Sequence, residues 1–242
     1  MTDADKQRWE EKLQAATGLV IGAYTAVHLA NHFGMHLGAD VHQAMFRRIH
    51  RFVTGNRPVE GALLLSILVH SVLSVKRCKG VAPGGSRLLH QAAGWFLLVS
   101  LPGHVYFTRV AGGERLLPPG QELSVAYAAT TSRVAPWLYV PYYAVLSACG
   151  AVHAFSGLAR AGRILDLLLI TNNVPFTGPA FWNTCKALAL AAASSSLAVS
   201  GVYFRYPIAN EQLFIDAVMS KLPPAIAKRI SFPDHAWFAK FT

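Results

Sequence analysis

Four histidines in this chain have a spacing that could do chemistry: His28, His70, His104 and His153. Each lies inside a hydrophobic stretch, roughly two helical turns before the charged end of that stretch. A strongly polar side chain at that depth in lipid is costly and is retained mainly where it binds something. Four histidines at matching depths therefore suggest, as a first interpretation, that they are ligands of a bound group.

The composition indicates that these stretches lie in a membrane. Of the 242 residues, 53% are hydrophobic and 14% are charged, whereas soluble domains carry about 25% charged residues. The formal charge of +10 comes from basic residues near the ends of the hydrophobic stretches, such as Lys76 and Arg77, and no nucleic-acid-binding motif accompanies them. We expect the basic residues to face lipid head groups, with no nucleic-acid partner.

Five stretches have about the 20 apolar residues that are needed to cross a bilayer. They cover residues 13–36, 58–75, 88–108, 134–158 and 181–204. The sequence therefore predicts an all-α integral membrane bundle of five transmembrane helices. The fifth stretch is rich in Ala and Ser, so a buried helix that does not span remains an alternative for it.

The rest of the chain frames this bundle. Residues 1–12 form a charged segment that mixes acidic and basic side chains, unlike a secretory or transit peptide. Residues 13–204 form the membrane domain, with the segments 38–57, 80–85, 111–133 and 171–179 as connectors. Residues 205–242 form an amphipathic tail that has a short helix over 210–222 and stops at Pro223.

The direction of the spans sorts the four histidines into pairs. Consecutive spans run in opposite directions, so His28 and His104 lie towards one membrane face and His70 and His153 towards the other. At a rise of 1.5 Å per residue, each pair lies about 10 Å below its own surface. Two bis-histidine sites at two depths follow.

Haem iron is the metal that best suits such pairs. Two neutral imidazoles give strong axial bonds and leave no position for oxygen, so the iron would transfer electrons. The chain has no Cys-x-x-Cys-His motif, so the haem, of type b, would be held non-covalently. Arg77, Arg109 and Arg160 lie near the relevant span ends, where they would bind haem propionates or simply extend to the interface.

Other interpretations of the same residues remain open. Any one histidine on its own is better explained by an interhelical hydrogen bond, and a scaffold without haem is the corresponding alternative for all four. His32 and His36 continue the stripe of His28, and would compete as ligands or form a small metal site. We expect the remaining histidines to be solvated, namely His42, His50, His90 and His235. The glycines of the spans would admit a flat macrocycle or close helix packing, namely Gly18, Gly22, Gly94, Gly150 and Gly157.

Several motifs resemble the five-helix cytochrome b anchors of succinate dehydrogenase and fumarate reductase. They are the stretch 17–32, the Arg57-Pro-Val-Glu opening of the second span, His104-Val-Tyr and Val152-His-Ala-Phe-Ser-Gly. In dihaem members of that family the first and third helices, and the second and fourth, supply paired ligands. The resemblance therefore implies the same pairs, His28 with His104 and His70 with His153.

A branch of this fold is more similar still, the eukaryotic mitochondrial adapter proteins of the outer membrane that are tied to lipid homeostasis. The similarity lies in His28-Leu-Ala-Asn, the segment 103–109, Ser124-Val-Ala-Tyr and the segment 142–157. It implies a multi-pass protein of a mitochondrial membrane, the outer one, with membrane lipid and a lipid-transfer or contact-site protein as partners. Members recruit that partner through a Pro-x-Pro motif near the N-terminus, and this chain has no such motif.

Two function classes follow from these resemblances. The first is a mitochondrial haem protein with an adapter role in lipid homeostasis, which is not an enzyme on its own. The second is an anchor subunit that passes electrons between flavoprotein and iron–sulfur subunits and quinone.

Overall fold

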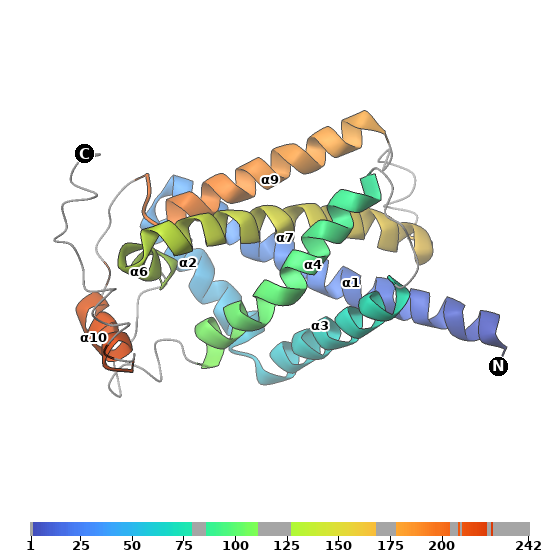
Figure 1. Cartoon of the computed structure of the whole chain (residues 1–242), viewed down its shortest axis with the longest axis horizontal. Helices are drawn as coiled ribbons and strands as arrows, with labels where there is room; N and C mark the ends of the chain where they lie inside the picture. Colours follow the sequence, from blue (N-terminus) through green and yellow to red (C-terminus); the bar gives the residue numbers. More distant parts are fainter. Residues whose placement is uncertain are drawn as a thin grey trace. The chain divides into compact units, whose positions relative to one another are not determined.

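The computed structural model describes residues 2–78, 86–110, 127–167, 178–203, 208, 210–221 and 224, and these contain helices but no strand (Figure 1). The elements are α1 (Asp3–Phe33), η1 (Gly34–Leu37), α2 (Ala39–Ile49), η2 (His50–Thr54), α3 (Arg57–Arg77), α4 (Ser86–Val105), η3 (Tyr106–Val110), α6 (Tyr127–Val134), α7 (Pro136–Ile164), α9 (Pro179–Val199) and α10 (Glu211–Lys221). The all-α prediction is confirmed for this part of the chain.

The chain divides into two compact units. The first comprises Met1–Leu101 and Ala144–Ser196, and the second Pro102–Tyr143 and Leu197–Thr242. Helices α4, α7 and α9 contribute residues to both units. The histidines 28, 70, 90 and 153 all belong to the first unit, and His104 belongs to the second.

Within the first unit, α1 and α3 pack against each other in opposite directions. Near the start of α1, Glu10 forms a salt bridge of 2.5 Å with Lys76 at the end of α3. Further along α1, Gly18 lies against His70, which precedes Lys76 on α3. The same reversal relates α1 to α7, where Gly22 packs on Leu158 and, further along α1, Thr25 lies against Gly150.

Helices α7 and α9 also run side by side in opposite directions (Figure 1). The hydroxyls of Ser147 and Ser196 share a hydrogen bond at one end of this contact. Towards the other end, Ala159 packs with Phe181 and Cys185 in a buried cluster. The small side chains at four of these positions, Ser147, Ser196, Ala159 and Cys185, let the two helix backbones approach closely.

Three helices are long and apolar enough to cross a membrane: Asp3–Leu37, Arg57–Arg77 and Pro136–Ile164. On α3 the apolar side chains Leu65, Leu68 and Val72 are 58–61% exposed, which is costly in water and favourable in lipid. Helices α4 and α9 cover the third and fifth predicted ranges, but within the described residues the three helices named above are the ones that qualify as spans.

One predicted connector is wrong, because residues 39–49 form helix α2 and a π-helical turn follows over His50–Thr54. Gly38, with φ 127°, turns the chain after α1, and the side chain of Met45 then lies against Gly34. His42 is only 3% exposed, so the expectation that it is solvated is wrong too. The sequence did not indicate this buried helix, because basic residues are interspersed with its apolar positions.

In the second unit, an ion pair joins two short helices. Arg133 of α6 donates to Glu211 of α10 at 2.6 Å. Helix α10, Glu211–Lys221, confirms the helix that the sequence predicts over 210–222. Helix α6 lies at the end of the predicted connector 111–133, whose residues 111–126 are outside the described ones, as are 80–85 and 171–177.

Candidate functional site

The structure brings His70 of α3 and His153 of α7 together in the first unit. Their ring centres are 6.2 Å apart, and the ring planes are inclined at 88°. Both side chains are partly buried. The pairing of the second and fourth predicted spans is therefore realised as a contact between the two predicted ligands.

Helix α1 holds the ring of His70. Its Nδ1 is 3.0 Å from the main-chain carbonyl oxygen of Gln14. One turn along α1, Gly18 leaves room for the ring, because a Cβ at that position would lie 2.9 Å from Cε1 of His70. A side chain of any size at Gly18 would displace the ring.

Helix α4 holds the ring of His153 in the same way. Its Nδ1 is 3.1 Å from the carbonyl oxygen of His90, and a Cβ at Gly94 would lie 2.8 Å from its Cε1. Here too the glycine comes four residues after the carbonyl that anchors the ring.

The side chains of the two anchoring residues complete this repeated plan. Gln14 donates to the hydroxyl of Ser74 at 2.8 Å, one turn after His70 on α3. His90 makes a 2.7 Å hydrogen bond with the hydroxyl of Ser156, three residues after His153 on α7. Each ligand candidate is thus fixed by a carbonyl, a glycine and a clamp on its own helix, which is how proteins orient metal-ligating imidazoles.

The hydrogen bonds decide which nitrogen of each ring carries the proton. A carbonyl oxygen only accepts, so Nδ1 of His70 and of His153 must be the donor. In a neutral imidazole the other nitrogen, Nε2, then keeps its lone pair. Within the described part of the chain, the hydrogen bonds of these two rings are the ones made by Nδ1. The unit therefore presents two unprotonated imidazole nitrogens.

Iron porphyrin fits this donor set by its chemistry, because haem iron takes neutral imidazole nitrogens as ligands. His70 and His153 would hold the group, since their rings come from two helices of one unit and have centres 6.2 Å apart with planes inclined at 88°. Haem bound there would supply one-electron redox chemistry.

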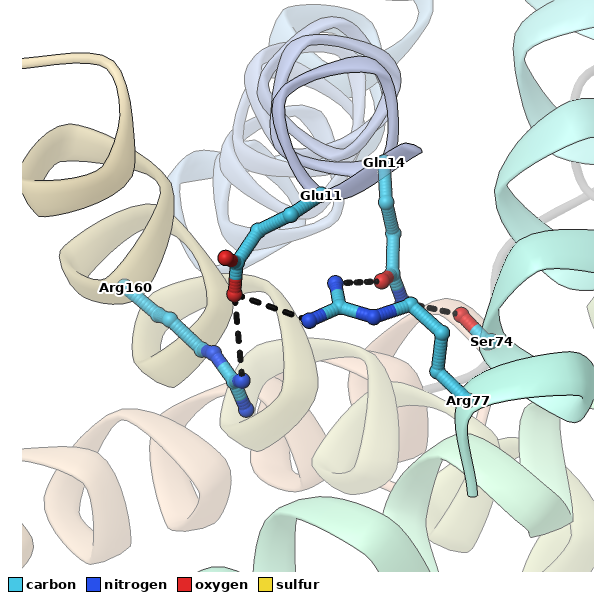
Figure 2. A network of polar contacts seen from close by, with 5 residues as sticks. All are labelled: Glu11, Gln14, Ser74, Arg77 and Arg160. Atoms are coloured by element: carbon cyan, nitrogen blue, oxygen red, sulfur yellow. Dashed lines mark hydrogen bonds and ion pairs between the residues drawn. The ribbon is translucent and has the colours of Figure 1, made fainter. Parts of the chain in front are cut away.

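A polar network joins the N-terminal part of α1 to the C-terminal end of α3 (Figure 2). Arg77 donates to the side-chain oxygen of Gln14 at 2.6 Å and to Glu11 at 2.8 Å, and Arg160 of α7 comes within 4.0 Å of the same Glu11 oxygen. Because His70, Ser74 and Arg77 lie at i, i+4 and i+7 on α3, all three reach Gln14 from one face. The guanidinium of Arg77, predicted to meet a haem propionate, is thus engaged by protein groups.

The other predicted pair is not formed within a single unit. His28 lies in the first unit, where its Nε2 is 3.1 Å from Nε2 of His32 and its ring stacks on Tyr24. His104 lies in the second unit, so the pairing of His28 with His104 stays a prediction. The side chain of Arg109 is outside the described residues. No three His, Cys, Asp or Glu side chains in the described ranges are arranged to hold a metal ion, which gives no support to a small metal site around His32 and His36.

Sequence reasoning missed His90, which it placed in solvent. The ring of His90 stacks on that of His153, with centres 4.2 Å apart and an interplanar angle of 14°. The repeated spacing from His90 to Gly94 and from Gln14 to Gly18 was a usable signal, because it presents a carbonyl and a glycine on one helix face. His50 stacks on Phe46 and is half-buried, while His235 is outside the described residues.

The sequence matches no protein-family model, no curated protein and no solved structure. The likeness to cytochrome b anchors and to mitochondrial adapters accordingly stays an expectation.

Proposed function

We propose that this chain is a multi-pass membrane protein that binds haem b non-covalently between His70 and His153. The observation that carries the proposal is the pair of imidazoles with ring centres 6.2 Å apart. In each ring Nδ1 donates to a main-chain carbonyl, so the lone pair of Nε2 is left to bind a metal. Haem held by two imidazoles supplies one-electron redox chemistry with no open coordination position.

The chain's own residues perform three tasks at this site. Gln14 and His90 fix the tautomer and direction of the two imidazoles through their carbonyls. Gly18 and Gly94 let the rings lie against α1 and α4. The exposed apolar side chains of α3 keep the site within lipid, which excludes water from it.

A second haem between His28 and His104, in a bundle of five spans, is the further part of the proposal. The short contact between Nε2 of His28 and Nε2 of His32 would have to open before His28 could ligate iron. The second site is therefore expected to fill at higher haem concentration than the first.

For the biological role we propose an adapter of a mitochondrial membrane, the outer one, that works in lipid homeostasis with a lipid-transfer or contact-site protein. This role is supported by the resemblance of the motifs and by the membrane-spanning character of α1, α3 and α7. An anchor subunit of a respiratory complex is the alternative, and the saturated bis-histidine donor set favours its electron-transfer chemistry.

The haem proposal is tested by the reduced-minus-oxidised spectrum of the full chain purified in mild detergent. We expect the α band of a b-type cytochrome, which the His70→Ala and His153→Ala variants should each lose at one site. His50→Ala is the matched control, because His50 is a half-buried histidine of the same unit whose ring stacks on Phe46. Absence of haem from the wild-type chain after reconstitution would refute the proposal.

The role is tested by what accompanies the protein and where it is found. Equimolar co-purification of a flavoprotein and an iron–sulfur subunit would establish the respiratory anchor and overturn the adapter. Recovery of the haem protein in the outer-membrane fraction without those subunits would support the adapter.

A further inference from the structure

His90 makes three different contacts with the segment that carries His153. Its carbonyl accepts the Nδ1 proton of His153 at 3.1 Å, its ring stacks on the His153 ring at 4.2 Å and 14°, and its own Nδ1 is 2.7 Å from the hydroxyl of Ser156. Gln14, the corresponding residue for His70, supplies a carbonyl and a side-chain clamp but no ring.

The direction of the hydrogen bonds shows that the His90 ring is locked. The hydroxyl of Ser156 lies 2.5 Å from the carbonyl oxygen of Val152, and since a carbonyl cannot donate, the single hydroxyl proton points there. Nδ1 of His90 must then donate to the Ser156 oxygen. The ring of His90 is therefore held in one orientation by a bond to the helix that carries His153.

A locked ring on one face of an imidazole restricts rotation of that imidazole. The His153 ring cannot turn about its Cβ–Cγ bond without leaving the His90 ring, while Gly94 allows close approach on α4. No ring stacks on His70 within the described residues, where its one ring contact is the 88° arrangement with His153. Because the His90 ring holds the plane of the His153 ring, it also decides the angle between the ring planes of His153 and His70.

We propose that His90, anchored by Ser156, is a positioning residue that sets the plane of the His153 ring perpendicular to that of His70. This inference rests on the haem proposed above. In low-spin ferric haem the angle between the axial imidazole planes splits the iron d orbitals, so perpendicular planes give a strongly anisotropic electron paramagnetic resonance (EPR) signal and near-parallel planes a rhombic one. The hydrogen bonds and packing around the ligands are the means by which proteins tune such iron.

The test is EPR of the full-length chain loaded with haem b, in wild type and three variants. We expect a strongly anisotropic signal from the wild type. His90→Ala keeps the main-chain carbonyl but removes the ring, so its signal should shift towards a rhombic or broadened form while haem remains bound. His90→Phe restores a stacked ring without the Ser156 bond, and its signal should return most of the way to that of the wild type.

Ser156→Ala removes only the anchor of the His90 ring, and it tests the same idea if His90→Ala does not fold. Its expected signal lies between those of the wild type and His90→Ala. Ser66→Ala is the matched control, because Ser66 makes the same bond to a carbonyl four residues earlier on its helix, at 2.8 Å, and this bond is exposed.

The outcomes separate this inference from the proposed function. A wild-type chain that takes up no haem refutes the function itself. A chain that binds haem but gives the same signal in the wild type, His90→Ala and Ser156→Ala keeps the function and overturns the positioning role. A rhombic wild-type signal also overturns it, because the planes would then not be perpendicular.

Discussion

Gly94→Ala is the most direct perturbation of the candidate site, because it adds one methyl group where the ring of His153 lies. The new Cβ would be 2.8 Å from Cε1 and 3.0 Å from Nδ1 of that ring. Carbon atoms at their optimal separation are about 3.5–4.0 Å apart, so the ring must retreat by about 1 Å. The nearest neighbour of the new methyl group is the ring itself, so no flexible side-chain end can move aside to relieve the clash.

The expected cost follows from that displacement. The bond from Nδ1 to the carbonyl of His90 is already 3.1 Å long, so a further ~1 Å takes it past hydrogen-bond range. Losing such a bond costs about 1 kcal/mol, and forcing a methyl group into a packed site costs about 1–3 kcal/mol. Together these costs come to about 2–4 kcal/mol, and the lower figure corresponds to roughly 30-fold weaker haem binding.

The assay is a haem titration of the apo-protein in detergent, followed by absorbance. Gly61→Ala and Gly150→Ala are the controls, because a Cβ at Gly61 meets nothing within 4 Å and one at Gly150 meets only Thr25 at 3.8 Å. Both lie on the helices that carry His70 and His153. Equal affinity of Gly94→Ala and the wild type, or equal loss in Gly61→Ala, would refute the assigned role of the glycine.

Three further predictions concern the surroundings of the site. Gln14→Leu removes the hydrogen bonds to Ser74 and Arg77 but keeps the carbonyl that anchors His70. The free energy of unfolding should therefore fall by about 1–2 kcal/mol, while the haem stoichiometry stays unchanged. Loss of haem before unfolding would contradict this. Glu11→Gln removes the partly exposed ion pair with Arg77, which should cost less than about 1 kcal/mol and make the unfolding midpoint less dependent on salt than that of the wild type. An equal salt dependence of the two proteins would argue against it. Burial lowers the pKa of His42 from 6.5 to about 4, so the packing of α2 against α1 is most stable above pH 6.5, where this histidine is neutral. As the pH falls towards 4, that packing should lose up to about 3 kcal/mol. Hydrogen exchange of the α2 amides, corrected for intrinsic rates, should show this loss of protection in the wild type and not in His42→Leu.

Helix content and the histidine pair were predictable because both depend on local pattern. Runs of apolar residues of bilayer length required helices, since a backbone in lipid must satisfy its own hydrogen bonds. Because the helices of His70 and His153 both run opposite to α1, similar depths along these two helices then placed the histidines at one level. The pattern did not reveal α2, where His42 occupies an inward position that is usually apolar.

The supports of the ligands could not be predicted, because they depend on which residues of other helices come opposite. His90 was expected in solvent, yet its ring covers His153. Arg77 was expected at a haem propionate or extended to the interface, and its bonds to Gln14 and Glu11 could not be foreseen (Figure 2). Main-chain carbonyls carry no side-chain signature, so an acceptor such as that of Gln14 is visible only once the helices are packed.

By itself, the sequence determined that the described part of the chain is helical, that several helices are long and apolar enough to cross a membrane, and that His70 and His153 come at a similar level, since composition and the rise of a helix decide these. Only the tertiary structure decided which carbonyl holds each imidazole, which glycine admits it and which ring covers its face. The physical reason is that depth depends on the residue count along one helix, whereas tautomer and ring plane depend on the rotation and offset of two helices packed side by side.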